Sequence, residues 1–334
     1  MHSILAPLAL SLALQATTEP APPPPTEQMK QEAAAIGAFV QTPFAKTFLG
    51  GFACLPSVTP RVAWYNKETR TALSDEAARA MTEEQLAGYA KRDIDERFYY
   101  FTRYGTPVAF VRPMEILGRA GLKSPDGLKL VDFGFGSMGQ LRALAAQGAD
   151  AVGIEVDPIL EVIYAGDTGR VPRCETAGAG REGSVELVFG QFPAEKAAVD
   201  KVGGGYDVFV SKNTLKRGYI HPEQEVDPRM LVHLKVDDET FVRAVYDLLK
   251  PGGFALIYNL CPAPAKPGEK YIPWADGRSP FAKELYERVG FAVVAFDVDD
   301  TEAARAMGKT FGWGTEEQLA TDLFGMYTLL RKPR

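Results

Sequence analysis

The stretch LVDFGFGSMGQL, residues 130–141, places three glycines, Gly134, Gly136 and Gly139, at the spacing G-x-G-x-x-G. An apolar run leads into the glycines, and a helix-like run over residues 141–146 follows them. Glycine permits positive φ and lets a ligand approach the backbone closely, while the start of a helix offers free N–H groups. The stretch therefore predicts a strand–turn–helix unit that holds a nucleotide-like cofactor.

The alternation of strands and helices continues along the rest of the chain. Apolar runs predict strands at residues 128–134, 151–156, 184–190, 206–211 and 254–260, with helices at 138–147, 157–166 and 237–250. Strands separated by helices pair in parallel through right-handed crossovers, which gives an open α/β sheet covered on both faces. The last two runs, residues 291–298 and 325–332, are joined by an excursion over residues 299–324 and predict an antiparallel hairpin at one edge.

The composition limits the kinds of partner. The chain has 334 residues, 46% of them hydrophobic, and a formal net charge of −6. This is the composition of a globular protein, and it argues against a broad cationic face for nucleic acid. The three cysteines, Cys54, Cys174 and Cys261, are far apart and have no histidine at ligand spacing, so no metal site is expected. Their pairing stays open, as does the oligomeric state.

The N-terminal residues predict export. Residues 1–16, MHSILAPLALSLALQA, contain an apolar run over 4–14 that suits a secretory signal and is too short for a membrane-spanning helix. We expect a signal peptide over 1–16, a Pro-rich linker over 17–25 and a mainly helical cap over 26–127 that packs on the sheet domain, 128–334. Without a functional signal the protein would be cytoplasmic.

Three features together resemble the class I S-adenosylmethionine-dependent methyltransferases over roughly residues 125–334. In VDFGFGSMG an acid, Asp132, stands two residues before the first glycine; LLKPGGFALIYNL has the pattern of the helix–turn–strand of the fifth strand; and the terminal hairpin has that of the sixth and seventh strands. The resemblance implies a Rossmann-like, doubly wound, mostly parallel seven-stranded sheet with the antiparallel seventh strand between the fifth and sixth. It also implies S-adenosylmethionine as the cofactor and methyl transfer as the activity.

The resemblance assigns roles to seven residues of this chain. Gly134, Gly136 and Gly139 would shape the cofactor loop, and Asp132 would lie near the amino group of the methionine part. Glu155 would accept hydrogen bonds from the ribose hydroxyls. Gln191 stands where the family often has an acid that accepts from the adenine amino group, and Asn213 follows the fourth strand, beside the cofactor.

Two other segments hold candidate residues without a family motif. SKNTLKRGYIH, residues 211–221, is rich in cations and predicts either an anion site or a solvated loop whose cations pair with nearby carboxylates. The aromatic segment that contains Tyr104 predicts either a lid over the methyl-transfer site or a packing seam between cap and sheet. Lys212, His221 and Tyr104 are candidate bases for an acceptor that must lose a proton.

Rival functions remain from the sequence. An NAD(P)-dependent oxidoreductase would explain the glycines and Glu155, yet not Asp132 or the terminal hairpin. An aminopropyltransferase lacks its expected acidic glycine-rich signature here. A non-catalytic extracytoplasmic binding protein that retains the fold is the third reading, because the cofactor is made in the cytoplasm. No D/N-P-P-Y-type motif occurs, so O-methylation or a small-molecule acceptor is favoured over amino methylation.

Overall fold

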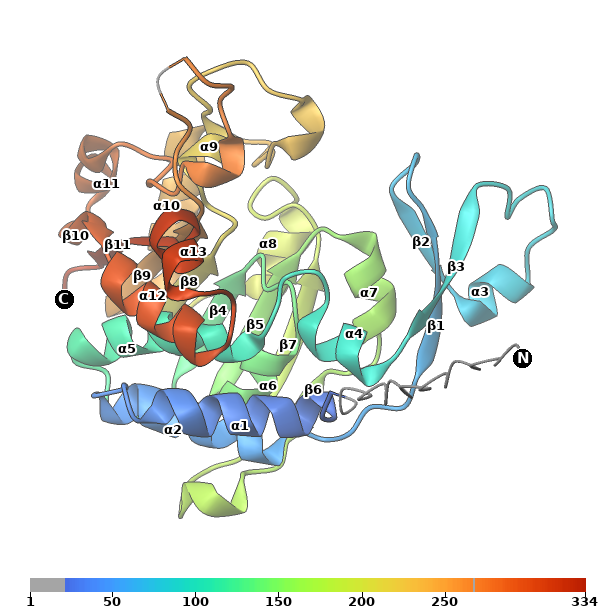
Figure 1. Ribbon diagram of the computed structural model, residues 1–334, viewed down its shortest axis with the longest axis horizontal. Coiled ribbons are helices and arrows are strands. Elements are labelled where there is room, and N and C mark those ends of the chain that lie inside the picture. Colours follow the sequence, from blue (N-terminus) through green and yellow to red (C-terminus); the bar gives the residue numbers. More distant parts are fainter. Residues whose placement is uncertain (1–21, 267) are drawn as a thin grey trace, which may run out of the picture.

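The computed structural model describes residues 22–266 and 268–334, so the expected signal, residues 1–16, and most of the Pro-rich linker lie outside the described residues. An eight-stranded sheet runs through the centre in the order β10-β11-β9-β8-β4-β5-β7-β6 (Figure 1). Its strands are β4 (Lys129–Phe133), β5 (Asp150–Glu155), β6 (Gly169–Val171), β7 (Gly183–Phe189), β8 (Tyr206–Lys212), β9 (Leu249–Cys261), β10 (Ala292–Asp299) and β11 (Phe324–Arg331).

The direction of the strands confirms the expected fold. Strands β7, β5, β4, β8 and β9 are parallel neighbours, and β11 runs antiparallel between β9 and β10. This is the order that the sequence predicts, with an antiparallel last strand inserted between the fifth and sixth strands of a mostly parallel α/β sheet. One strand was not expected: β6 pairs antiparallel with β7 at the edge. Its three residues, Gly169–Val171, are too short to give a strand-like apolar pattern.

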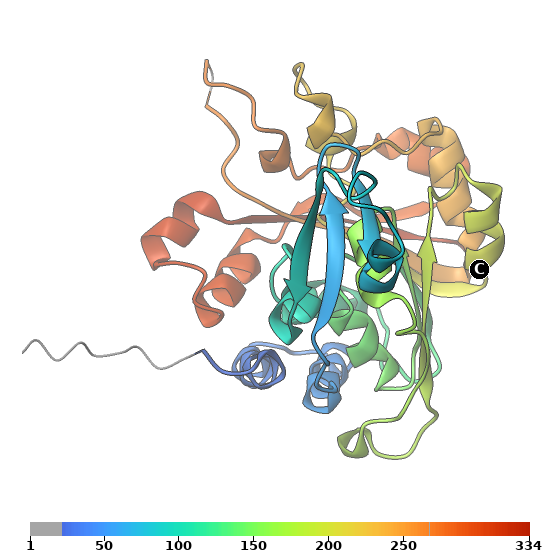
Figure 2. The ribbon, with the colours of Figure 1, turned by 90° about the vertical axis from the view of Figure 1, so that its right-hand side faces the viewer.

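Helices cover both faces of this sheet, as the alternating pattern predicts (Figures 1 and 2). The core on one face takes side chains from the N-terminal helices and from α6 and α7, and the core on the other face takes them from α8, α10 and α11. These helices are α6 (Gly139–Ala145), α7 (Pro158–Tyr164), α8 (Lys196–Val202), α10 (Asp238–Leu248) and α11 (Lys283–Val289). Short helical segments also lie in the loops, namely α9 (Arg217–Ile220), η3 (Glu175–Ala177), η4 (Pro228–Met230) and η5 (Pro273–Ala275).

The excursion between the last two strands is more regular than expected. It forms α12 (Thr301–Thr310) and α13 (Glu316–Asp322), and α13 begins with a capping box made by Thr315 and Gln318. Buried Ala304 and Met307 of α12 face the protein, and α12 packs on β11. Only a narrow apolar stripe holds the helix, which is why its sequence pattern is weak.

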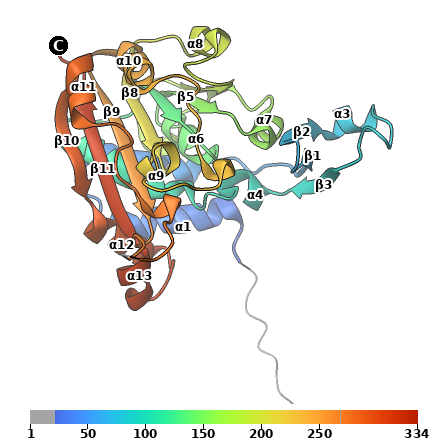
Figure 3. The ribbon, with the colours of Figure 1, turned by 90° about the horizontal axis from the view of Figure 1, so that it is seen from above.

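The N-terminal part is only partly helical. Its helices are α1 (Pro25–Gly37), α2 (Pro43–Gly50), η1 (Gly51–Cys54), α3 (Asp75–Arg79), α4 (Glu96–Phe101), η2 (Pro107–Phe110) and α5 (Val111–Arg119). Between them β1 (Arg61–Asn66), β2 (Thr71–Ser74) and β3 (Tyr89–Ile94) form an antiparallel sheet in the order β2-β1-β3, which packs on α7 and extends to one side of the molecule (Figure 3).

The expectation of a mainly helical cap over residues 26–127 was therefore wrong in part. Residues 89–94, which lie in a stretch with a helical pattern, form β3 and pair with β1 over its whole length. Pairing with another strand overrides local propensity, which the sequence alone does not reveal. Residues 61–70 form β1 and the turn that leads to β2.

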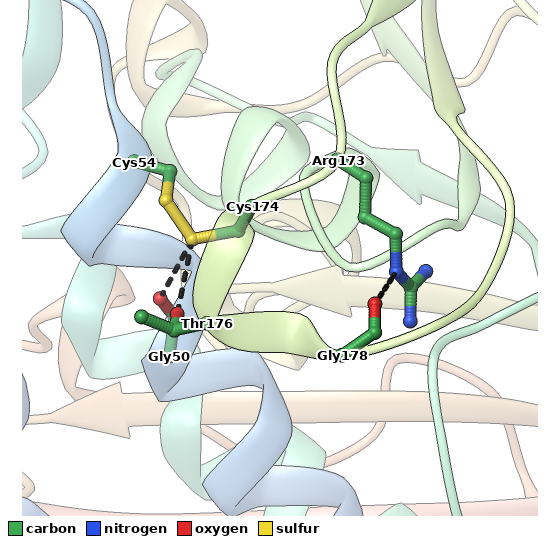
Figure 4. Close-up of a disulfide and its surroundings, with 6 residues drawn as sticks. All are labelled: Gly50, Cys54, Arg173, Cys174, Thr176 and Gly178. Atoms are coloured by element: carbon green, nitrogen blue, oxygen red, sulfur yellow. Dashed lines mark hydrogen bonds between the residues drawn. A yellow bond between two sulfur atoms is a disulfide. The ribbon is translucent and has the colours of Figure 1, made fainter.

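A disulfide joins the N-terminal part to the sheet (Figure 4). Cys54 at the end of η1 pairs with Cys174, 120 residues later, with the two Cα atoms 5.6 Å apart. Nearby, the backbone of Gly51 lies so close to α6 that a Cβ there would be 2.1 Å from the carbonyl oxygen of Ala143. Cys261 is the free cysteine and is buried. The N-terminal part thus shares a core and a covalent link with the sheet.

Candidate cofactor site

The glycine loop lies where β4 ends and α6 begins. Gly134 and Gly136 have φ angles of 73° and 62°, which side chains rarely adopt, so glycine is needed at both places. A Cβ on Gly134 would lie 2.1 Å from the hydroxyl oxygen of Thr214, and one on Gly136 would lie 2.8 Å from the ring of Tyr104. Gly139 opens α6 against Pro107. The three glycines therefore form a close-packed turn, as predicted.

Asp132 lies in β4 directly below this turn and is completely buried. Its Oδ2 atom accepts a hydrogen bond of 3.1 Å from the side-chain amide of Gln140, whereas Oδ1 has no partner among the described residues. Burial raises the pKa of Asp132 to about 7, against the opposing effects of Gln140 and Lys212. A buried carboxyl oxygen without a partner is costly in a folded protein, which makes it a place where a ligand would donate a hydrogen bond.

Glu155 ends β5, the strand beside β4, and its carboxylate contacts the glycine loop. One oxygen accepts a hydrogen bond from the backbone N–H of Gly136 at 3.3 Å, and the other accepts from the backbone of Val156 at 2.8 Å and of Asp157 at 3.3 Å. Burial raises the pKa of Glu155. The structure therefore brings Glu155 and the glycines together, at the edge where parallel strands of an open sheet bind ligands.

Lys212 is the last residue of β8 and is half-buried. Its ammonium lies 5.3 Å from the centre of the Phe110 ring and has no hydrogen-bond or ion-pair partner among the residues that the structure describes. Loss of water around it, together with the nearby charge of Lys216, lowers the pKa of Lys212 to about 8, although Asp132 acts in the opposite direction. Lys212 is therefore available to a ligand.

Asn213 and Gln191 have a less direct relation to the site. Asn213 has a φ of 65°, its backbone N–H donates to Tyr258, and its Oδ1 accepts from the backbone of Leu260 at 2.7 Å. These bonds hold the ends of β8 and β9 together, so its side-chain oxygen is already occupied. Gln191 follows β7, is half-buried, and its backbone N–H donates to Glu195. Its side-chain amide makes no hydrogen bond within the described part of the chain.

The aromatic segment packs between the N-terminal part and the sheet, and its end contacts the glycine loop. Tyr99, Tyr100 and Phe101 are buried and form part of the core between the N-terminal part and the sheet. Tyr104 is 50% exposed and lies on Gly136, while Arg103 donates to the Tyr104 hydroxyl at 2.8 Å and to Asp157 at 2.7 Å. The segment is thus a packing seam up to residue 101 and a cover of the glycine loop at Tyr104.

The structure does not place His221 beside Asp132, Lys212 and the glycine loop. Its Nε2 atom lies 2.9 Å from both carboxylate oxygens of Asp238, at the start of α10, and the side chain is largely exposed. The loop of residues 211–221 is therefore divided: Lys212 lies at the glycine loop, whereas Lys216 donates to the carbonyls of Leu260 and Trp274 and His221 pairs with an acid. His221 is engaged as a surface pair rather than as a base beside Asp132.

Three residues of the site were not singled out from the sequence. Gln140 holds Asp132 in place and also donates to the carbonyl of Phe135 at 2.6 Å. Thr214 fills the space over Gly134, and Val156 leaves an apolar side chain 52% exposed beside Glu155. The position of Gln140, one residue after the third glycine, is a signal that sequence reasoning can use, because a polar side chain there faces back toward β4. The contact of Thr214 depends on tertiary structure alone.

Comparisons with known proteins give only distant similarities. Neither a family model nor a curated protein matches the chain. Among solved structures, the chain is similar to the [4+2]-cyclase SpnF, with 16% identity over 62% of this chain and 75% of that one and a TM-score of 0.37. A methyltransferase from Mesorhizobium loti that depends on S-adenosylmethionine has 17% identity, coverage of 64% and 95%, and a TM-score of 0.34.

A third similar structure is phosphoethanolamine N-methyltransferase 2 from Haemonchus contortus, bound to phosphomonomethylethanolamine and S-adenosylhomocysteine. It has 14% identity over 74% of this chain and 63% of that one, with a TM-score of 0.40. The chemistry of this chain depends on its own residues at the site, because one fold hosts many functions.

Two features are absent from the part of the chain that the structure describes. None of its helices combines the length and the apolar character that crossing a membrane requires. The same residues contain no cluster of three or more histidine, cysteine or acidic side chains placed to hold a metal ion.

Proposed function

We propose that the protein binds S-adenosylmethionine at the glycine loop and transfers its methyl group to an acceptor. The observation that carries the proposal is the antiparallel strand β11 between β9 and β10. A dinucleotide-binding sheet has the order 3-2-1-4-5-6 with no such insertion, so the oxidoreductase reading loses its main support. Fold alone does not determine function, and the residues around the loop supply the second part of the argument.

The residues present fit this cofactor. Asp132 offers a buried carboxyl oxygen without a partner, and Gly134 and Gly136 leave no side chain on the loop. Glu155 would accept from the ribose hydroxyls, Val156 offers an apolar surface to the adenine ring, and Gln191 would meet its amino group. The sulfonium of the cofactor would supply an electrophilic methyl group. The protein would align this methyl group with the acceptor, and such alignment lowers the activation barrier of methyl transfer by roughly 7–11 kcal/mol in the best cases.

The acceptor is proposed to be a small molecule or a hydroxyl group. Residues 211–214 lie at the end of β8, the fourth parallel strand along the chain, and their sequence SKNT is not the D/N-P-P-Y-type motif of amino-methylating enzymes. Tyr104 and Lys212 are the two candidate bases that lie at the glycine loop. Burial raises the pKa of Tyr104 and lowers that of Lys212, so Lys212 is the better base near neutral pH.

We also propose that the protein acts outside the cytoplasm. The support comes from the pattern of residues 1–16 and from the disulfide between Cys54 and Cys174, because structural disulfides persist in oxidising compartments. The mature chain would begin near Thr17. Intact-mass analysis of protein from its native host tests this, since a mass that includes Met1 would contradict export.

Substitution of Glu155 tests the proposed site. Glu155→Ala should weaken S-adenosylmethionine binding by about 1–3 kcal/mol, because the ribose hydroxyls lose their acceptor. Glu155→Gln retains one acceptor oxygen and should lose less. Glu161→Ala, a change on the exposed side of α7, serves as the control and should bind as the wild type does. Equal affinities for all four proteins in calorimetric titration would remove Glu155 from the site.

A non-catalytic binding protein is the alternative function that a structural observation favours. The disulfide favours a compartment without an obvious supply of S-adenosylmethionine. Such a protein would keep the fold and the packing of the glycine loop, yet would bind no sulfur nucleoside. The titration just described separates the two readings.

A further inference from the structure

The N-terminal part reaches the glycine loop through a strained turn, residues 101–104. α4 ends at Phe101, and the backbone N–H of Tyr104 donates to the carbonyl of Phe101 at 3.1 Å. Thr102, the first central residue of this turn, has φ 48° and ψ −132°. Glycine usually supplies such values, at the corresponding place of a type II′ turn. Because a β-branched residue is strained in this conformation, the turn costs free energy that other contacts must offset.

The two residues after Thr102 make the contacts that offset this cost. Arg103 donates to the carboxylate of Asp157 at 2.7 Å. Tyr104 lies on Gly136, so that a Cβ on Gly136 would be 2.8 Å from the Tyr104 ring. Arg103 also donates to the Tyr104 hydroxyl at 2.8 Å, which joins the two side chains into one unit. These contacts hold the strained turn against the glycine loop.

The contacts that hold the turn lie at the surface. Tyr104 is 50% exposed, and the side chain of Arg103 is 65% exposed. An exposed ion pair stabilises a structure only weakly. Gly105 follows directly with φ 79°, and glycine lets the backbone change direction there. The turn therefore has a strained residue on one side, a glycine on the other and weak contacts between them.

We propose that residues 102–105 form a strap that opens to admit a ligand to the glycine loop, and that the strained backbone of Thr102 favours the opening. Gly136 lacks a side chain on the face that Tyr104 covers, so Tyr104 and a ligand of the loop compete for that face. In the open strap Thr102 adopts an ordinary conformation, and the relief of strain offsets the loss of the Arg103 ion pair. The identity of the ligand as a sulfur nucleoside rests on the proposed function, whereas the strap controls access for any ligand of this loop.

Two substitutions should shift the strap in opposite directions. Thr102→Gly removes the strain of the closed turn and should favour the closed strap about 3- to 10-fold. Arg103→Gln removes the ion pair with Asp157 and should favour the open strap about 2- to 5-fold. A general loss of stability would shift both variants in the same direction, so the opposite signs are specific to the strap.

Hydrogen exchange with mass spectrometry measures the opening in the protein alone. A peptide that covers residues 102–106 contains the amide of Tyr104, which donates within the turn. After correction for intrinsic rates, this peptide should exchange more slowly in Thr102→Gly than in the wild type and faster in Arg103→Gln. Circular dichroism of every variant establishes that it is folded before rates are compared.

Two control variants change the same kinds of feature away from the glycine loop. Arg70 has a φ of 54° in the turn between β1 and β2, so Arg70→Gly removes a positive φ of a side-chain-bearing residue there. Arg79→Gln removes the exposed ion pair with Asp75 in α3. Both should leave exchange in residues 102–106 unchanged.

Stopped-flow association of S-adenosylhomocysteine is the second measurement. Since only the open strap admits the ligand, the association rate should fall about 3- to 10-fold in Thr102→Gly and rise about 2- to 5-fold in Arg103→Gln. The two control variants should associate as the wild type does.

The outcomes separate the strap from the proposed function. If neither substitution changes exchange, or if Thr102→Gly speeds exchange and association, the strap is overturned while the cofactor stands. If Arg103→Gln slows association and leaves exchange unchanged, Arg103 binds the ligand and the strap is again overturned. If S-adenosylhomocysteine does not bind the wild type, the proposed function fails, and the exchange rates alone decide whether the strap opens as proposed.

Discussion

At the scale of single residues, the buried carboxyl group of Asp132 lowers the stability of the fold and has one oxygen that can still accept a hydrogen bond. The carboxyl group is fully buried, and Gln140 supplies its hydrogen bond from within the described residues while one oxygen stays without a partner. Burial raises its pKa to about 7. Groups with such perturbed pKa values gather at functional sites, where a bound ligand compensates for their cost.

Because the pKa of Asp132 is raised, we expect replacement of this residue to stabilise the protein more at high pH than at low pH. Because the folded pKa of about 7 exceeds the ordinary value of 3.8, the folded protein binds more protons than the unfolded one between these values, and stability falls as the pH rises through this window. Asp132→Asn abolishes that loss. Relative to the wild type, its free energy of unfolding should rise by about 2 kcal/mol more at pH 8 than at pH 5.

Urea unfolding at the two pH values measures this difference. Asp200→Asn, on the exposed side of α8, is the control and should show a difference between variant and wild type that does not change with pH. A constant difference for Asp132→Asn as well would mean that the buried carboxyl has an ordinary pKa in the folded protein.

At the scale of elements, the disulfide holds η1 of the N-terminal part against the segment between β6 and β7. A cross-link that closes a loop of 120 residues restricts the unfolded chain. Beside the disulfide, η1 packs on α6, where Phe52 joins the core and the backbone of Gly51 closely approaches Ala143. The disulfide therefore adds a covalent link to the β6–β7 segment next to a contact that is made by packing.

Loss of the disulfide should cost about 3–5 kcal/mol in the free energy of unfolding, as expected for a closed loop of this length. Urea unfolding of the wild type and of the double variant Cys54→Ser, Cys174→Ser measures the loss. Thiol labelling in denaturant should detect one thiol per chain before reduction, that of Cys261, and three after it. Three thiols before reduction would contradict the disulfide in the isolated protein.

The elements also show what a sequence can predict. The strands of the parallel sheet are short apolar runs between turn residues, so β4, β5, β7 and β8 are recognisable without the structure. β3 is not, because its burial pattern leaves four of its six residues exposed and its partner β1 lies more than twenty residues away. The glycine loop and Glu155 follow from local spacing, whereas the cover by Tyr104 follows only from tertiary contacts.

At the scale of the whole molecule, the residues of the site lie together at the carboxyl ends of adjacent parallel strands. Asp132 comes from β4, Glu155 from β5 and Lys212 from β8, and the aromatic segment of the N-terminal part reaches the same place. The antiparallel strand β11 lies on the far side of β9 from these residues. Its presence identifies the type of sheet, and the residues at the loop determine what that sheet binds.

The central claim, that this site binds a sulfur nucleoside cofactor, is tested most directly by calorimetric titration of the protein with S-adenosylmethionine, S-adenosylhomocysteine and NAD. We predict binding of the first two with dissociation constants in the micromolar range and no binding of NAD. Binding of NAD alone would contradict the claim and restore the oxidoreductase reading. Binding of none of the three would contradict it in favour of a protein that retains the fold without the cofactor.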